Sequence, residues 1–397
     1  MRRRDAGYRS ASKVRPGGHV VTTACSRRDW LACCAALAGT MALPSTGRGS
    51  RGDTGWTLVP SAPEPATLRL CFNENPHGPP ASAVRAAQAA LNRANRYADQ
   101  EEFDGLAGLI AERERVTPAH VLLGTGSSEL LALAAIACFR GGGELVTADP
   151  TFPHLVTMAE RLGARVRRIP LDLRGVHDLD AMAEAVGNET RLVNVCNPNN
   201  PTGTIVDGAH LRGFCEQVSR RAPVLVDEAY HELVHAPEHA SMAPLARDGI
   251  PILVMRTFSK VYGMAGYRVG YVIAPPSLIE RLRAHQSTDL GPAAIAAAFA
   301  AYQDRRFVER SRRLVREARE LTERGLDSLG INHVPSHASF IWFESGPRRR
   351  DLPLWLHARG VRISWDVEPL AGDWARVSIG TTAEMRRFLR ELEAVWD

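Results

Sequence analysis

Lysine is nearly absent from this chain, and one of its two lysines stands where it could do covalent chemistry. Of the 49 Lys and Arg residues only Lys13 and Lys260 are lysines, and Lys260 ends the segment Arg256–Lys260 (RTFSK). A lysine amine can lose its proton and attack a carbonyl, whereas a guanidinium stays protonated. The retained lysine therefore indicates Schiff-base chemistry, for which pyridoxal 5'-phosphate (PLP) is the expected partner. The alternative is that a general bias toward arginine spared one lysine by chance.

Two segments before Lys260 carry residue types suited to a flat, phosphorylated ligand. In Gly124–Glu129 (GTGSSE) small residues stand between an expected strand and helix, where free backbone N–H groups favour a phosphate. Such turns are also common helix caps. In Asp149–Pro153 (DPTFP) Phe152 follows a strand, where an aromatic ring either stacks on a heterocycle or joins the core.

Two later segments add polar groups at the ends of expected strands. In Asn197–Gly203 (NPNNPTG) a rigid turn presents Asn200, whose amide could donate to a phenolate oxygen; an ordinary turn is the alternative. In the next segment Asp227 ends a buried strand, where a carboxylate is costly unless paired. A protonated pyridine nitrogen would pair it, and Tyr230 could then bond the ring's 3-oxygen. The alternative role for Asp227 is a helix cap.

The segment around Lys260 completes the set. Thr257 and Ser259 offer hydroxyl groups, and Arg268 offers a planar fork that suits a phosphate. The glycines at 263, 266 and 270 permit a tight backbone path between these side chains.

These residues need a scaffold, and the pattern from about residue 105 predicts one. Short apolar strands alternate with amphipathic helices, which indicates an α/β fold with a mostly parallel sheet. Strands are expected at 121–123, 145–148, 166–169, 192–196, 224–226, 252–255 and 270–273, with helices near 128–139, 154–162, 178–186, 208–220 and 277–286. A charged run at about 293–325 is expected to form one solvated connecting helix. Strands near 339–343, 361–364 and 376–379 and a helix from about 382 indicate a smaller α+β unit.

Composition narrows the class of protein. The net charge of +5 comes largely from the first 50 residues, so the body is close to neutral and nothing favours nucleic acid as a partner. The seven cysteines form no CxxC pair and no zinc-like spacing with histidine, so no metal site is expected. Cys138, Cys196 and Cys215 lie in apolar segments and are expected to be buried thiols.

The N-terminus resembles an export signal. Arg27 and Arg28 precede an apolar run, Leu31–Leu43, that has the length of a signal-peptide core and is too short to span a membrane. Paired arginines followed by an aromatic and a leucine are similar to a twin-arginine signal, which exports folded proteins. We expect a leader at 1–45 and a linker at 46–66, with a periplasmic or exported location. A disordered leader on a cytoplasmic protein, or a misassigned start, is the alternative.

Taken together, these motifs resemble the class I/II aminotransferases of PLP fold type I, and most closely the histidinol-phosphate aminotransferases. Phe72–Pro79 (FNENPHGP) is similar to that subfamily's N-terminal motif, and Ala375–Thr381 (ARVSIGT) is similar to its C-terminal motif. The resemblance covers about residues 68 to 390. It implies an aspartate-aminotransferase-like fold with an arm and interface segment at 67–100, a large PLP-binding domain at 101–290 and a small domain at 291–397.

The resemblance also implies roles for single residues. Lys260 forms the Schiff base and moves a proton, Asp227 holds the pyridine nitrogen, and Arg376 and Asn75 bind the substrate. Tyr97 reaches the partner's phosphate site, which implies a homodimer with shared active sites. The other implied cofactor-binding residues are Gly126, Ser127, Ser128, Phe152, Asn200, Tyr230, Thr257, Ser259 and Arg268. The expected reaction transfers an amino group from an amino acid or amino-phosphate to a 2-oxo acid.

The sequence departs from the subfamily on the substrate side. Ala98 stands where a proline usually follows the interface tyrosine, and Ser364 stands where an arginine usually helps to bind the anionic substrate, with Arg362 two residues earlier. The substrate is therefore open, and export would not suit a role in histidine biosynthesis. A PLP-dependent lyase or decarboxylase on the same scaffold is the alternative. A non-catalytic PLP sensor would need a DNA-binding domain, for which the first 66 residues are too short.

Overall fold

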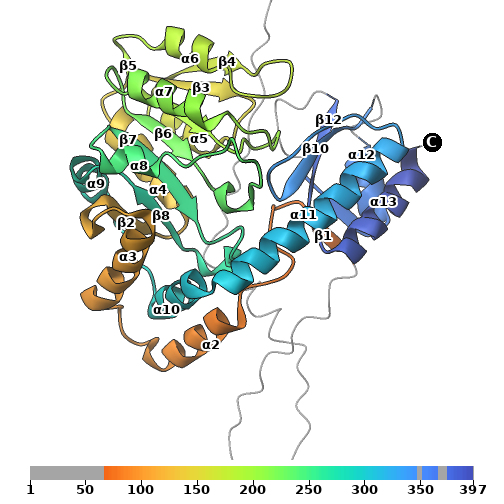
Figure 1. Cartoon of the computed structure of the whole chain (residues 1–397), viewed down its shortest axis with the longest axis horizontal. Helices are drawn as coiled ribbons and strands as arrows, with labels where there is room; N and C mark the ends of the chain where they lie inside the picture. Colours follow the sequence, from red (N-terminus) through yellow and green to blue (C-terminus); the bar gives the residue numbers. More distant parts are fainter. Residues whose placement is uncertain (1–66, 347–350, 365–372, 397) are drawn as a thin grey trace, which may run out of the picture. The chain divides into compact units, whose positions relative to one another are not determined.

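The structure is a computed structural model, and it describes residues 67–346, 351–364 and 373–396 (Figure 1). The predicted leader and linker lie outside the described residues, so both stay predictions. The domain boundaries expected at residues 100 and 290 stay predictions as well.

A seven-stranded sheet carries the large α/β layer. Its strand order is β2-β8-β7-β6-β5-β3-β4, and every neighbouring pair is parallel except those that involve β8. The strands are β2 (Val121–Gly124), β3 (Glu144–Asp149), β4 (Arg165–Pro170), β5 (Thr190–Cys196), β6 (Val224–Asp227), β7 (Ile252–Thr257) and β8 (Gly270–Ile273). The predicted α/β fold with a mostly parallel sheet is confirmed, and all seven expected strands are present.

Helices cover both faces of this sheet, which explains why its central strands are apolar at every position. In β6, Val224 and Val226 join one core cluster and Leu225 joins the other, and all three side chains are fully buried. The first cluster includes α6 (Leu179–Ala185), α7 (Gly208–Val218) and α8 (Ala243–Arg247). The second includes α4 (Ser127–Phe139), α5 (His154–Arg161) and α9 (Pro276–Arg283). Parallel strands buried in this way leave polar residues only at their ends.

The single solvated helix expected at 293–325 is wrong. The chain forms α10 (Pro292–Gln303) and α11 (Arg305–Ser328), separated by Asp304, whose side chain accepts from the Phe307 N–H and so caps α11. Neither helix is merely solvated. The helix α10 packs against α2 (Ala81–Ala90) and α3 (Gln100–Glu114), while α11 packs against α13 (Thr382–Trp396).

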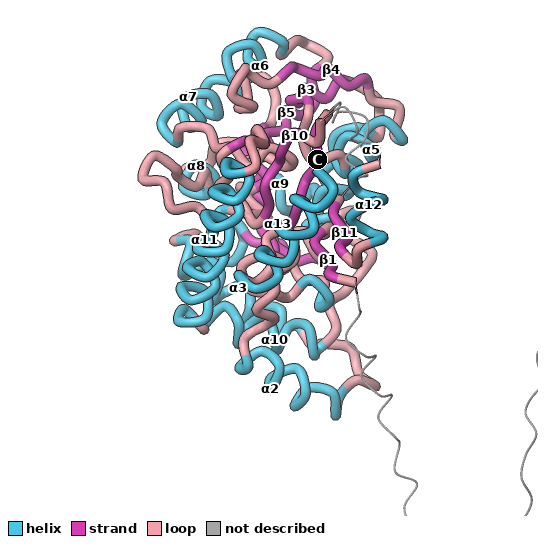
Figure 2. The backbone as a smooth tube through the Cα atoms, turned by 90° about the vertical axis from the view of Figure 1, so that its right-hand side faces the viewer, coloured by secondary structure: helices cyan, strands magenta, loops and turns pink. Residues whose placement is uncertain are grey.

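The C-terminal region holds two small sheets. An antiparallel sheet has the order β12-β10-β9, formed by β9 (His333–Val334), β10 (Phe340–Glu344) and β12 (Trp374–Ser378). The second sheet pairs β11 (Val361–Ile363) in parallel with β1 (Leu68–Leu70), a strand that the sequence analysis did not predict. Figure 2 shows β1 and β11 side by side, with α12 (Leu352–Ala358) next to them. This pairing brings the segment after β1 to the C-terminal region.

The predicted burial of the cysteines is confirmed for Cys196 and Cys215, and Cys138 is half-buried. Among the described residues, no helix is long and apolar enough to cross a membrane.

Candidate active site

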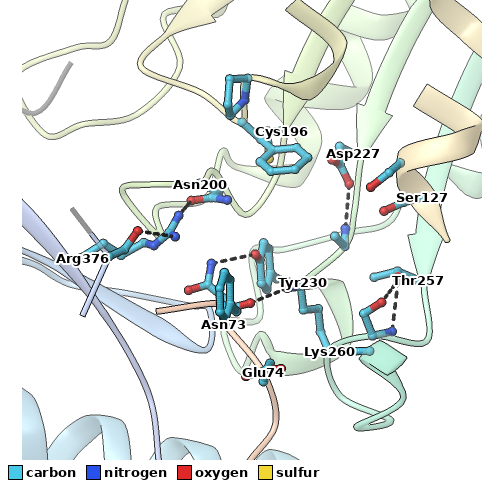
Figure 3. A pocket seen from close by; sticks show the side chains of 18 of the residues that line it. Asn73, Glu74, Ser127, Cys196, Asn200, Asp227, Tyr230, Thr257, Lys260 and Arg376 are labelled. Carbon is cyan, nitrogen blue, oxygen red and sulfur yellow. Dashed lines mark hydrogen bonds between the residues drawn. The ribbon is translucent and has the colours of Figure 1, made fainter. Parts of the chain in front are cut away.

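A cavity of about 400 Å³ opens at the carboxyl ends of the parallel strands (Figure 3). Its walls come from the segments after β2, β3, β5, β6 and β7, and from two segments far away in the sequence, the one after β1 and the C-terminal strand β12. Because the ends of parallel strands meet at one edge of the sheet, residues scattered over the chain converge here.

Lys260 lies in the loop after β7, with its amine inside the cavity. Its Nζ donates a hydrogen bond of 3.3 Å to the Phe72 carbonyl and lies 5.4 Å from the centre of the Tyr230 ring. Burial, with a further contribution from the Arg376 guanidinium, lowers the pKa of Lys260 from 10.5 to about 8. With a pKa of about 8, roughly a tenth of this amine is neutral, and so nucleophilic, at pH 7.

Asp227 ends β6 on the cavity wall with only 4% of its surface exposed. Its carboxylate accepts one hydrogen bond of 3.1 Å, from the Ala229 N–H. No Lys, Arg or His of the described residues lies within ion-pair distance of it. Burial raises the pKa of Asp227 from 3.8 to about 6, while Lys260 acts in the opposite direction. The Asp227 carboxylate is thus buried in the cavity wall without a cationic partner among the described residues.

The predicted phosphate-binding residues gather at the N-terminus of α4. Gly126 precedes the helix at φ +86°, a backbone conformation that strains any other residue, and a Cβ atom there would displace the Arg268 guanidinium. Arg268 Nη1 donates to Ser259 Oγ at 3.4 Å and to the Ala265 carbonyl at 2.8 Å. Thr257 Oγ1 donates to Ser259 Oγ at 2.9 Å. The result is a cluster of hydroxyl groups and one guanidinium beside a helix N-terminus.

Four other predicted residues line the same cavity, and one of them is Tyr230. Phe152 forms part of the wall, and its ring lies 6.3 Å from the His154 ring at an angle of 18°. Asn200 accepts a hydrogen bond through Oδ1 from Arg376, which Figure 3 shows as a dashed line. Arg376 also donates to Ser364 Oγ at 3.1 Å. The guanidinium that was predicted to bind a carboxylate is thus held at the cavity by polar neighbours.

Besides Gly126, two predicted residues lie outside the cavity lining. The Asn75 side chain donates to the Val261 carbonyl at 2.8 Å and accepts from the His77 N–H at 3.0 Å, so it holds the local backbone. Tyr97 is 92% exposed, as a side chain that reaches a second subunit would be in one chain alone. Their roles in binding substrate and in the partner's site stay predictions.

Asn73 and Glu74 are two polar lining residues for which no role was predicted from the sequence. Asn73 is 2% exposed, has the left-handed φ of +55° and donates from Nδ2 to the Tyr230 hydroxyl at 3.1 Å. Glu74 lines the cavity and pairs with Arg69 at 2.9 Å. Both belong to the motif at 72–79, but nothing in that motif distinguishes Asn73 from Asn75. The two asparagines differ in contacts with distant segments: Asn73 bonds to Tyr230, whereas Asn75 bonds to the Val261 carbonyl.

A buried ion cluster lies directly beside the cavity wall. Glu228, 1% exposed, pairs with Arg256 at 2.7 Å and also accepts from the Met242 N–H at 2.7 Å. Arg256 further contacts Glu232 at 3.3 Å and donates to Ser241 Oγ at 2.9 Å. Every charge in this cluster has a partner, so it serves to join the ends of β6 and β7 to the segments that follow them.

Known proteins resemble this chain in both sequence and fold. The family model "Aminotransferase class I and II" matches residues 65–392. The histidinol-phosphate aminotransferase of Moorella thermoacetica is 37% identical over 331 residues, which cover 83% of this chain and 85% of the relative. Among the solved structures that match are two that each cover 83% of this chain. The histidinol-phosphate aminotransferase of Sinorhizobium meliloti in complex with pyridoxal-5'-phosphate is 26% identical, and the match covers 90% of that protein with a TM-score of 0.78.

The second structure is a double mutant of Thermus thermophilus aspartate aminotransferase, 24% identical and 91% covered, with a TM-score of 0.75. At that identity it shows the fold alone, and it confirms the aspartate-aminotransferase-like architecture expected from the motifs. The family match spans nearly all the described residues, including every wall of the cavity. The chain therefore belongs to the class I and II aminotransferases, a family of PLP-dependent enzymes.

Proposed function

We propose that this aminotransferase binds PLP in the cavity of Figure 3, on the Lys260 amine, and exchanges amino groups between an amino donor and a 2-oxo acid. The observation that carries the proposal is the Asp227 carboxylate, which is buried and has no cationic partner among the described residues. A protonated ring nitrogen would supply the missing positive charge.

The other walls of the cavity also fit this cofactor. The hydroxyl groups of Ser127, Ser128, Thr257 and Ser259 and the Arg268 guanidinium form a donor set that suits a phosphate dianion. Gly126 keeps the backbone open at this place, because a Cβ atom would meet Arg268. Phe152 offers an aromatic face to a flat ring.

When bound, PLP supplies an aldehyde that reacts with amines and a cationic ring that accepts electrons. The residues of this chain do the rest. The Lys260 amine, with its pKa lowered to about 8, takes a proton from the substrate Cα and returns it during turnover. Asp227 keeps the ring nitrogen protonated. Arg376 binds the substrate carboxylate and so orients Cα toward Lys260, which favours transamination over loss of that carboxylate.

The mouth of the cavity favours an anionic or flat side chain on the substrate. Phe72 lines the cavity with half of its surface exposed, and the guanidinium carbons of Arg69 and Arg362 lie 5.8 and 5.5 Å from its ring. Arg69 is neutralised by Glu74, whereas no acid of the described residues pairs with Arg362. We therefore propose a donor with a negative or aromatic distal group. The names of the relatives make histidinol phosphate one candidate. This amine has a phosphate ester in place of the carboxylate, so with this donor Arg376 would bind the phosphate and, in the second half of the reaction, the carboxylate of the 2-oxo acid.

The assembly and the location of the protein follow only from the sequence pattern. We propose a homodimer in which Tyr97 reaches the partner's phosphate-binding residues, supported by its 92% exposure. We also propose export through the twin-arginine route, supported by Arg27, Arg28 and the apolar run after them. Replacement of both arginines by lysine would retain the protein in the cytoplasm if the second proposal is right, as cell fractionation would show.

A donor panel tests the function directly. Purified protein with PLP and 2-oxoglutarate is incubated with histidinol phosphate, acidic, aromatic and small neutral amino acids, and an amine without a carboxylate. Formation of glutamate together with the matching carbonyl product supports the proposal. Release of ammonia or carbon dioxide without glutamate would contradict it and would point to a lyase or decarboxylase.

A further inference from the structure

The Tyr230 hydroxyl has one proton, and the structure indicates where that proton goes. Tyr230 follows β6, is 4% exposed and lines the cavity. Burial raises its pKa well above 10, so the hydroxyl stays protonated at neutral pH. The hydroxyl accepts a hydrogen bond of 3.1 Å from Asn73 Nδ2, and no acceptor for its own proton is found in the described part of the chain.

The orientation of the Asn73 side chain is fixed by Ser378, at the end of β12. The Asn73 backbone N–H donates to Ser378 Oγ at 2.7 Å, so this oxygen acts as an acceptor on that side. The Ser378 hydroxyl in turn donates to Asn73 Oδ1 at 3.0 Å. Because Oδ1 is bound to Ser378, the amide can present only its Nδ2 group to Tyr230.

The arrangement is costly to build, which argues for a purpose. Asn73 and Ser378 are 2% and 3% exposed, and Asn73 has a left-handed backbone at φ +55°. The three residues come from the segments after β1 and β6 and from the end of β12, so the contact ties the ends of the described chain to the large sheet. Figure 3 shows Asn73 and Tyr230 joined at the cavity.

We propose that Asn73, held by Ser378, is a positioning residue that forces Tyr230 to act as a hydrogen-bond donor toward the ligand in the cavity. With its oxygen occupied by an N–H donor on the Asn73 side, Tyr230 directs its only proton to the opposite side. The proposal rests on the proposed function, in which the acceptor is the 3-oxygen of PLP. A donor at that oxygen stabilises its anionic form, and therefore lowers the pH at which the bound cofactor loses its proton.

The test reverses the polarity at residue 73. In Asn73→Asp one carboxylate oxygen still accepts from Ser378 and the other accepts from Tyr230, which diverts the tyrosine proton away from the ligand. The reading is the pH midpoint of the visible absorbance change of bound PLP, measured in the holoenzyme. Loss of the hydrogen bond from Tyr230 to a charged oxygen should raise this midpoint by about one to two pH units.

The negative charge that Asn73→Asp introduces would raise the midpoint by itself, because it favours the protonated form of the bound cofactor. Each variant is therefore compared in the wild-type and Tyr230→Phe backgrounds. We expect the Asn73→Asp shift to be larger in the wild-type background by about the shift that Tyr230→Phe causes alone. Equal shifts in both backgrounds would overturn the proposal, because only charge would then matter.

Neutral variants complete the design. Asn73→Ala leaves Tyr230 free to donate and should move the midpoint only slightly, whereas a shift as large as that of Tyr230→Phe would contradict a role in directing the proton. Ser378→Ala frees the amide to turn and should raise the midpoint partway; no change would also overturn the proposal. Asn188→Asp, on an exposed loop, is the charge control. If the wild type forms no visible absorbance with PLP, the proposed function itself fails.

Discussion

Two neighbouring carboxylates at the end of β6 differ in their partners. Glu228 turns into the protein, where Arg256, Ser241 and the Met242 N–H satisfy it. Asp227 turns into the cavity, where it has one backbone donor and no cation among the described residues. Both are almost fully buried. A buried acid that the chain pairs is part of the scaffold, whereas a buried acid that the chain leaves unpaired marks a place for a cationic ligand.

The largest effect is expected at Lys260, whose amine lies in the same cavity as Asp227. Lys260→Ala removes both the covalent anchor and the base, so turnover should fall by about 10³-fold or more. The comparison is activity with saturating PLP, together with the visible absorbance of the bound cofactor. Lys13→Ala is the matched control, because it removes the only other lysine. Wild-type turnover in Lys260→Ala would refute the role of this residue.

Replacing the two acids by their amides should change the free energy of unfolding of the cofactor-free protein in opposite directions. Glu228→Gln leaves Arg256 with a weakened ion cluster and should lower the free energy of unfolding by about 3 kcal/mol. Asp227→Asn removes an unpaired charge and should raise it by about 2–3 kcal/mol at pH 7.5, from the difference between a pKa of about 6 and the ordinary 3.8. Urea denaturation of both variants measures this difference.

The pH dependence sharpens that contrast. The raised pKa of Asp227 means that the native state favours the protonated form, so the cost of its charge is absent below about pH 4 and complete above about pH 6. The gain from Asp227→Asn should therefore vanish as the pH falls from 7.5 to 4. Asp289→Asn, at an exposed position, should show no such change. A gain that is constant over this range would show that charge is not its cause.

A smaller effect is expected from the cation on the far side of the cavity. Arg376→Gln should reduce kcat/KM for donors with a carboxylate by about 10- to 100-fold and leave an amine without a carboxylate much less affected. Since the Arg376 guanidinium lowers the pKa of Lys260, its loss should also raise the pH midpoint for acylation of Lys260 from about 8. Mass spectrometry of the cofactor-free protein follows that reaction on one peptide. A similar loss for both donors would remove Arg376 from carboxylate binding.

The smallest effect is expected at the cavity mouth. Arg362→Gln should raise KM for acidic donors by a few-fold with kcat unchanged, because an exposed cation adds about 1 kcal/mol or less. Arg220→Gln, at another exposed position, is the control for the loss of surface charge. An equal change in KM for neutral donors would mean that Arg362 does not interact with the charge of the substrate.

The sequence predicted the large sheet and most of the site because both follow from local pattern. Each apolar strand ends in a polar segment, so Lys260, Asp227, Asn200 and Phe152 were expected at one edge, and the structure places them there. What the pattern could not show were contacts between distant segments. The pairing of β1 with β11 has no local signal beyond three residues, and the contact of Asn73 with Tyr230 joins segments 157 residues apart.

The break between α10 and α11 was missed for a related reason. The alanine-rich and arginine-rich halves both have helical periodicity, so only the cap by Asp304 separates them. Likewise Glu228 and Asp227 are adjacent acids that look alike in sequence. The difference between them depends on Arg256, 28 residues further along the chain, which the sequence alone does not place opposite Glu228.

The most direct test is to trap the cofactor on the protein. The holoenzyme is reduced with borohydride, which fixes PLP to the amine that holds it, and the modified peptide is identified by mass spectrometry. The account predicts one adduct, on Lys260, and its loss when a donor amino acid is added without an acceptor before reduction. An adduct on Lys13 or the N-terminal amine, with Lys260 unmodified, would contradict it.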